Sequence, residues 1–127
     1  MSDTSHGPGR VLVAVYAVFA LAASARSIFQ LATRADDAPF AYTLSAFAGV
    51  VYVVATYALA TSRRGLALVT IGLELAGVLV VGTLSLVDDA LFPDQTVWSG
   101  FGAGYVFIPL VLPLVGLWWL RRTAPRA

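Results

Sequence analysis

Four long apolar runs, joined by short polar connections, constrain the fold of this chain more than any other feature. They cover residues 11–32, 40–60, 66–86 and 99–120 of a 127-residue sequence. Each run is close to the ~20 residues that an α-helix needs to cross ~30 Å of hydrocarbon. The composition agrees, with 59% hydrophobic and 12% charged residues. We therefore predict an all-α membrane protein with four transmembrane helices in one domain.

The connections predict how these helices are arranged. Residues 33–39 and 61–65 are short enough to make consecutive helices antiparallel neighbours, as in an up-down-up-down bundle. The connection over 87–98 is longer and contains a proline. The small, polar and Gly/Pro-broken segment 1–10 is expected to be a disordered tail, and 121–127 a basic tail.

The arginines predict the orientation in the membrane. Six of the eight cations precede the first run, fill the second connection or follow the fourth run: Arg10, Arg63, Arg64, Arg121, Arg122 and Arg126. The other side carries Arg34 and five acids, Asp36, Asp37, Asp88, Asp89 and Asp94. The positive-inside rule then predicts that both termini are cytoplasmic in a plasma (inner) membrane.

The first run also has the pattern of a secretory signal. A basic residue, an apolar stretch and Ala23-Ser24-Ala25 match a small-residue cleavage site. Apolar residues resume at Ile28 and continue to Ala32, which a mature N-terminus would not need. We therefore interpret the run as a retained first helix.

Two charges inside the spans are the sharpest chemical feature. Arg26 lies in the first run and Glu74 in the third, where each charge costs at least ~2.5–3.5 kcal/mol at a helix centre. Counting ~1.5 Å per residue puts them about 10 Å apart in depth, a gap that an arginine can largely close. They are expected to face the bundle interior, either as an ion pair that fixes helix register or as part of a transport or proton-relay path. The remaining alternative is that Arg26 pairs with a partner subunit or extends outward to the membrane surface.

Other polar residues extend this candidate intramembrane site. Ser27 and Gln30 follow Arg26 on the first run, and Thr70 lies one helical turn before Glu74. They can line a narrow cavity, or they can form ordinary hydrogen bonds between helices. The second interpretation is favoured.

Glycines predict places where helices approach closely. Gly77 belongs to a small-residue face of the third run, and Gly100 and Gly104 form a small-xxx-small pair in the fourth. Pro109 and Pro113 are expected to kink that helix. The glycines do not follow a strand, so they are no nucleotide-binding fingerprint.

The sequence excludes several kinds of chemistry. There is no cysteine, and the single histidine lies in the N-terminal tail, so thiolate, metal and haem sites have no support. We predict no enzyme, no cofactor and, at a net charge of +1, no nucleic-acid partner. The expected partners are the lipid bilayer and other membrane subunits or further copies of the chain. The long connection is a candidate outer contact loop through Asp88, Asp89, Asp94 and Trp98.

The stretch AASARSIFQLATRADDAPFAYTLSAFAGVVYVVATYAL resembles a family of small four-helix integral membrane proteins of actinobacterial type. The resemblance extends from Tyr16 through TLSLVD at 83–88 to Tyr105. It implies no activity and carries over no functional residue. It marks five places for testing: Arg26, Gln30, Pro39, Tyr42 and the connection from Asp88 to Trp98.

Three functional hypotheses follow. The first is an accessory or scaffolding subunit of a larger membrane assembly. The alternative is a homo-oligomeric small-solute or ion transporter or channel that uses the Arg26/Glu74 polar stripe, because four helices alone enclose little space. The third is a binding or sensing protein that uses the acidic outer loops. The first two differ in whether Arg26 and Glu74 meet in a sealed core or face water.

Overall fold

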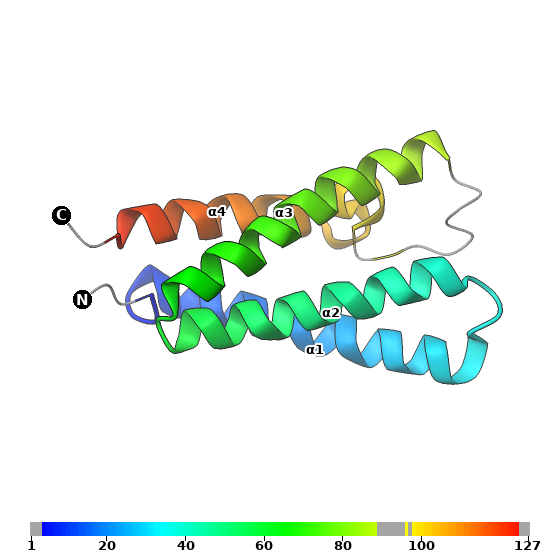
Figure 1. Ribbon diagram of the computed structural model, residues 1–127, viewed down its shortest axis with the longest axis horizontal. Helices are drawn as coiled ribbons and strands as arrows, with labels where there is room; N and C mark the ends of the chain where they lie inside the picture. The colour runs from blue at the N-terminus through cyan, green and yellow to red at the C-terminus, as the bar shows by residue number, and fades with distance from the viewer. Residues whose placement is uncertain (1–3, 89–95, 97, 125–127) are drawn as a thin grey trace.

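A computed structural model describes residues 4–88, 96 and 98–124, and this part of the chain is helical with no strand (Figure 1). The five helical elements are, in chain order, α1 (Pro8–Arg34), α2 (Pro39–Ala60), α3 (Arg64–Val87), the 3-10 helix η2 (Ser99–Tyr105) and α4 (Ile108–Arg122).

Three of these helices are long and apolar enough to cross a membrane. They are α1, α2 and α3, with 27, 22 and 24 residues. The count becomes four if η2 and α4 together form one span, although a bend of 99° separates them. The helical, multi-span character predicted from the apolar runs is confirmed. The first three predicted runs lie inside helices that begin one to three residues earlier and end at most two residues later.

Proline sets the start of three helices. Pro8, Pro39 and Pro109 each occupy the first turn, where the missing N–H has no helical partner to lose. The tight turn between α2 and α3 contains Ser62 in the left-handed conformation, at φ 56°. The Arg63 amide donates to the Ala58 carbonyl across that turn at 2.8 Å.

The N-terminal segment differs from the disordered tail predicted for residues 1–10. Residues 1–3 lie outside the described part of the chain, but α1 begins at Pro8 and Thr4 is fully buried. The Thr4 hydroxyl donates to the Leu59 carbonyl at 2.5 Å, and its own carbonyl accepts from Trp119 Nε1 at 3.0 Å. These bonds attach the segment to α2 and α4, and no local sequence pattern reports them.

The fourth predicted span is wrong as a single helix over 99–120. Gly100 and Gly102 have φ of 59° and 84°, and Phe101, Val106 and Phe107 also adopt positive φ. Such angles favour glycine and end a right-handed helix. The proline effect is also displaced, because Pro109 starts α4 rather than kinking it and only Pro113 lies inside the helix.

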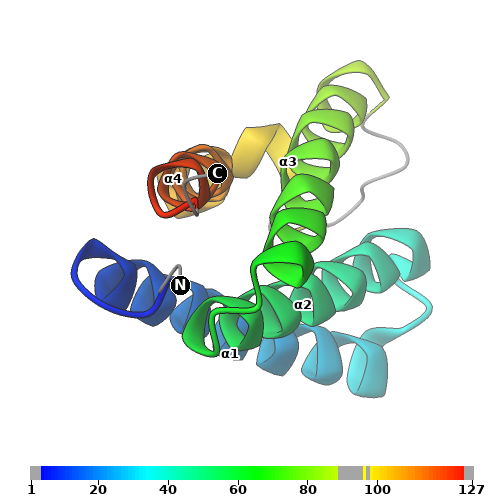
Figure 2. The same cartoon turned by 60° about the vertical axis from the view of Figure 1, so that its left-hand side comes forward.

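The helices pack as a layered group, and the four-span antiparallel bundle stays a prediction because the fourth span is bent between η2 and α4. Figures 1 and 2 show α1 and α2 side by side along their length, with α3 crossing them and α4 beside α3. Both chain ends and the α2–α3 turn lie at the same end of the molecule, which we call the terminal end (Figure 1). The main core joins all four helices through buried side chains that include Tyr16, Tyr52, Ile71 and Leu112.

Candidate functional site

A buried carboxyl group lies at the centre of the helix packing. Glu74, on α3, has no exposed surface, and its Oε1 accepts a hydrogen bond of 2.6 Å from the Tyr16 hydroxyl of α1. Its other oxygen, Oε2, is buried and has no hydrogen-bond partner. An unpaired charge in apolar surroundings is costly. The carboxyl group therefore needs a proton on Oε2 or an additional partner.

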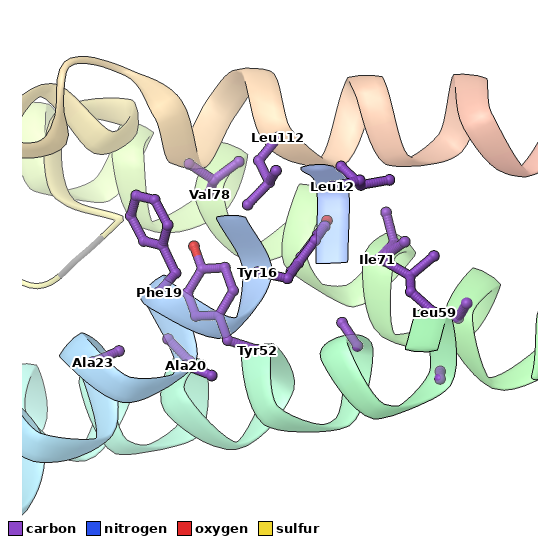
Figure 3. Close-up of a cluster of buried hydrophobic side chains, with 14 of the residues drawn as sticks. Leu12, Tyr16, Phe19, Ala20, Ala23, Tyr52, Leu59, Ile71, Val78 and Leu112 are labelled. Atoms are coloured by element: carbon purple, nitrogen blue, oxygen red, sulfur yellow. The ribbon is translucent and has the colours of Figure 1, made fainter. Parts of the chain in front are cut away.

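An aromatic cluster surrounds this carboxyl group. Figure 3 shows the rings of Tyr16 and Tyr52 close together among Phe19, Ile71, Val78 and Leu112. The Tyr16 and Tyr52 ring centroids are 6.1 Å apart, and Tyr52 also lies 6.4 Å from Trp98. Trp98 Nε1 donates to the Tyr52 hydroxyl at 3.0 Å. Tyr16, Tyr52 and Trp98 are each no more than 1% exposed, so this polar centre is enclosed by rings.

Arg26 does not take part in this centre. Its side chain is exposed, and its Nη1 donates to the Tyr105 hydroxyl of η2 at 2.9 Å. No ion pair links it to Glu74, whose one hydrogen bond comes from Tyr16. The expectation that both charges face the bundle interior is therefore wrong for Arg26. The buried stripe of α1 passes through Ala23, Ser27 and Gln30, and Arg26 lies one position off it.

The remaining residues of the predicted stripe are buried but do not form one path. The Ser27 hydroxyl donates to the Ala23 carbonyl at 2.6 Å, and Thr70 donates to the Leu66 carbonyl at 2.9 Å. Each bond stays within its own helix. Gln30 is 2% exposed, and its Oε1 has no partner. Thus Ser27, Thr70 and Gln30 show no hydrogen bond to Glu74 or Arg26.

The three predicted packing glycines have different environments. A Cβ on Gly77 would lie 2.5 Å from the Trp98 ring, so this glycine does permit a close approach. Gly100 instead lies in the left-handed break, where its amide donates to Ser85 Oγ at 2.8 Å. Gly104 is exposed. Since η2 is a 3-10 segment, Gly100 and Gly104 do not share the helical face expected of them.

The predicted outer contact loop is only partly described. Asp88 is exposed at the end of α3, whereas Asp89 and Asp94 lie outside the described residues. Trp98 is buried against Gly77 and Tyr52, so its role as a contact residue is wrong. Its indole N–H donates to the Tyr52 hydroxyl, and buried tryptophans usually have such an internal acceptor.

Sequence reasoning missed the partners of both charges. Tyr16 and Tyr105 were not singled out, although Tyr16 lies on the buried i, i+3/i+4 stripe of α1 that continues through Ala20, Ala23 and Ser27. That spacing was a usable signal for Tyr16. Tyr105 carried no such signal, because its position depends on the break in the fourth span.

The described residues contain no cluster of three His, Cys, Asp or Glu side chains able to hold a metal ion. The arrangement can hold a proton at Glu74 and can present a cation at Arg26. Comparison with protein-family models, curated proteins and solved structures finds no match to this chain. The resemblance to four-helix actinobacterial membrane proteins therefore stays a prediction.

Proposed function

We propose that this chain is an accessory or scaffolding subunit of a larger membrane assembly. The observation that carries the proposal is the exposed guanidinium of Arg26 inside the α1 span. The sealed centre formed by Glu74, Tyr16, Tyr52 and Trp98 supports it, because an enclosed polar group stabilises a compact unit and gives solutes no route.

The depth of Arg26 makes its exposure significant. It is 18 residues from Pro8 and eight from Arg34, or about 27 Å and 12 Å along the helix. Centring α1 on ~30 Å of hydrocarbon leaves Arg26 about 8 Å inside the nearer boundary. Side chains of a helix lean toward its N-terminus, so Arg26 leans away from that boundary. Arg26 has one hydrogen bond there, from its guanidinium to a hydroxyl. A carboxylate on a neighbouring transmembrane helix would best compensate its charge.

No described acid of this chain can play that role at the same depth. Glu74 is enclosed and bonded to Tyr16, and Asp36, Asp37 and Asp88 are exposed residues beyond the helix ends. The partner carboxylate is therefore expected to come from another subunit.

Removing this cation should separate the chain from its partner. We expect wild type, extracted gently from its native membrane, to retain foreign subunits in stoichiometric amount, and Arg26→Gln to recover at least about tenfold less of them, because breaking a buried charge pair costs several kcal/mol. Native gels with mass spectrometry give the composition. Arg34→Gln, an exposed arginine two turns further along α1, should leave recovery unchanged. A pure homo-oligomer in all three samples would contradict the proposal.

The alternative is a homo-oligomeric transporter or channel. The break between η2 and α4 favours it, because discontinuous helices form the binding sites of many transporters. In such an oligomer Arg26 and Tyr105, which lie beside the break, would face a pathway between copies. Ion flux through reconstituted wild type that is lost in Arg26→Gln would favour this alternative.

We further propose a plasma (inner) membrane location with both termini cytoplasmic. The terminal end carries the described arginines Arg10, Arg63, Arg64, Arg121 and Arg122, while Arg34 and the described loop acids lie at the other end. This distribution agrees with the positive-inside rule.

Cysteine labelling tests the orientation cleanly, because the chain has no cysteine of its own. Asp37→Cys, in the α1–α2 connection, should react in intact cells with a membrane-impermeant maleimide. Gly65→Cys, at the exposed start of α3 with open space around it, should react only after the cells are permeabilised. The reverse pattern would contradict the proposed orientation.

A further inference from the structure

An apolar groove separates α1 from α4 near the terminal end. It has a volume of about 500 Å³ and is lined by four residues of each helix: Pro8, Val11, Leu12, Val15, Ile108, Val111, Leu112 and Val115. This volume lies within the ~300–1,000 Å³ range of small-molecule sites. The lining covers seven residue steps of each helix, or about 10 Å along the helix axis. The groove is therefore a short apolar channel that runs along the helices.

The groove is bounded by defined contacts. Buried Leu12 and Leu112 belong to the core beneath it. At the terminal end, Trp119 of α4 donates to the Thr4 carbonyl, and a Cβ on Gly9 would collide with both. These contacts join α4 to the start of α1 just beyond the groove.

One face of α4 leads from the groove to the exposed side chain of Arg122. Val111, Val115, Trp118 and Arg122 follow one another at steps of four, three and four residues, which places them on one helical face. The Arg122 guanidinium lies 5.7 Å from the centre of the Trp118 ring. Both side chains are exposed. An apolar channel thus ends in an aromatic ring and an exposed positive charge, at the depth where Trp and Arg meet lipid headgroups.

The arginines near the terminal end of the groove have no described counterion. Arg10 and Arg121 are exposed at the same end, and Arg64 Nη1 donates to Thr123 Oγ1 at 3.3 Å beside them. The described acids are Asp36, Asp37, Glu74 and Asp88, and none lies at this end. An occupant that combines an apolar body with an anionic head would match both the groove and these described arginines.

We propose that this groove binds an acyl chain of an anionic phospholipid whose phosphate pairs with Arg122. A transmembrane helix fits less well, because a 10 Å length of helix 10 Å wide occupies about 800 Å³. A lipid chain is thinner, and its headgroup supplies the missing anion. The proposal is independent of the accessory role and of the pairing of Arg26.

Lipid titration of the purified protein tests this site. Phosphatidylglycerol and phosphatidylcholine with identical acyl chains are added in neutral detergent, and native mass spectrometry counts the lipids that remain bound. Wild type is expected to bind one phosphatidylglycerol more tightly than phosphatidylcholine. Arg122→Gln should reduce this preference about fivefold, which corresponds to ~1 kcal/mol for one basic residue near an anionic headgroup.

Matched variants distinguish specific binding in the groove from non-specific attraction to positive charge or to apolar surface. Arg121→Gln removes the adjacent charge from a different face of α4 and should keep the preference. Val111→Trp should fill the groove and weaken the binding of both lipids. Val18→Trp, at a slightly more exposed position of α1 outside the groove, should not. Equal binding of the two lipids, or equal loss in Arg121→Gln and Arg122→Gln, would overturn the proposal. So would a Val111→Trp variant that changes the oligomeric mass instead, which would make the groove an interface between copies.

Discussion

Gly77→Ala is expected to lower the free energy of unfolding by about 1–3 kcal/mol, the usual range for overpacking a core. A Cβ at this position would lie 2.5, 2.7 and 2.9 Å from three carbons of the Trp98 ring. Trp98 is 1% exposed and hydrogen-bonded to Tyr52, so its ring has no free space into which it could move. Unfolding in detergent, followed by heating or by a graded denaturant, measures the loss.

Gly72→Ala is the matched control for this prediction. It lies on the same helix, and a Cβ there would meet no atom within 4 Å. Since alanine is the better helix former by ~1 kcal/mol, this variant should be as stable as wild type or slightly more so. If both variants behave alike, the close packing of Trp98 on Gly77 is contradicted.

Tyr16→Phe is expected to cost about 1–3 kcal/mol of stability, because it leaves Glu74 fully buried without a single hydrogen-bond donor. The double variant Tyr16→Phe/Glu74→Leu should recover much of that loss, since removing both polar partners is often nearly neutral. Thermal unfolding of the two variants in the same detergent compares them directly.

Tyr57→Phe controls for the loss of a tyrosine hydroxyl, since Tyr57 is 49% exposed on the surface of α2. It should unfold like wild type. A Tyr16→Phe variant of unchanged stability, or a double variant weaker than the single one, would show that the bond between Tyr16 and Glu74 does not stabilise the core. Because Arg26 lies elsewhere, replacing Glu74 leaves no cation without its counterion.

The sequence was sufficient to predict where the first three helices lie in the chain. It was not sufficient to predict how each helix is rotated about its own axis, which decides the residues that face the core. Apolar length fixes where a helix can cross a membrane, so α1, α2 and α3 were predicted with small errors at their ends. The pairing of Arg26 with Glu74 was inferred from depth alone. One residue step turns a helix by 100°, and Arg26 is one step from buried Ser27, which is enough to expose it.

The prediction of one continuous fourth helix was wrong for a different physical reason. Its apolar composition is the same whether the backbone is a continuous helix or a broken one, so hydropathy cannot separate the two. The sequence predicts Gly100 and Gly104 as small residues for packing, whereas the left-handed angles of Gly100 and Gly102 allow the chain to turn. A Cβ on Gly102 would lie 2.7 Å from Pro109, so the break also depends on a tertiary contact.

The shortness of α4 has a consequence for the surrounding lipid. Its 15 residues span about 22 Å, some 8 Å less than a typical hydrocarbon core, and η2 turns away at 99° instead of continuing it. Lipid beside a short helix must thin to match it, at a cost of fractions of a kcal/mol per Å. The α4 side of the molecule would thus be a focus of bilayer deformation. This elastic strain would draw the protein toward thinner regions of membrane and toward any neighbour that relieves the mismatch.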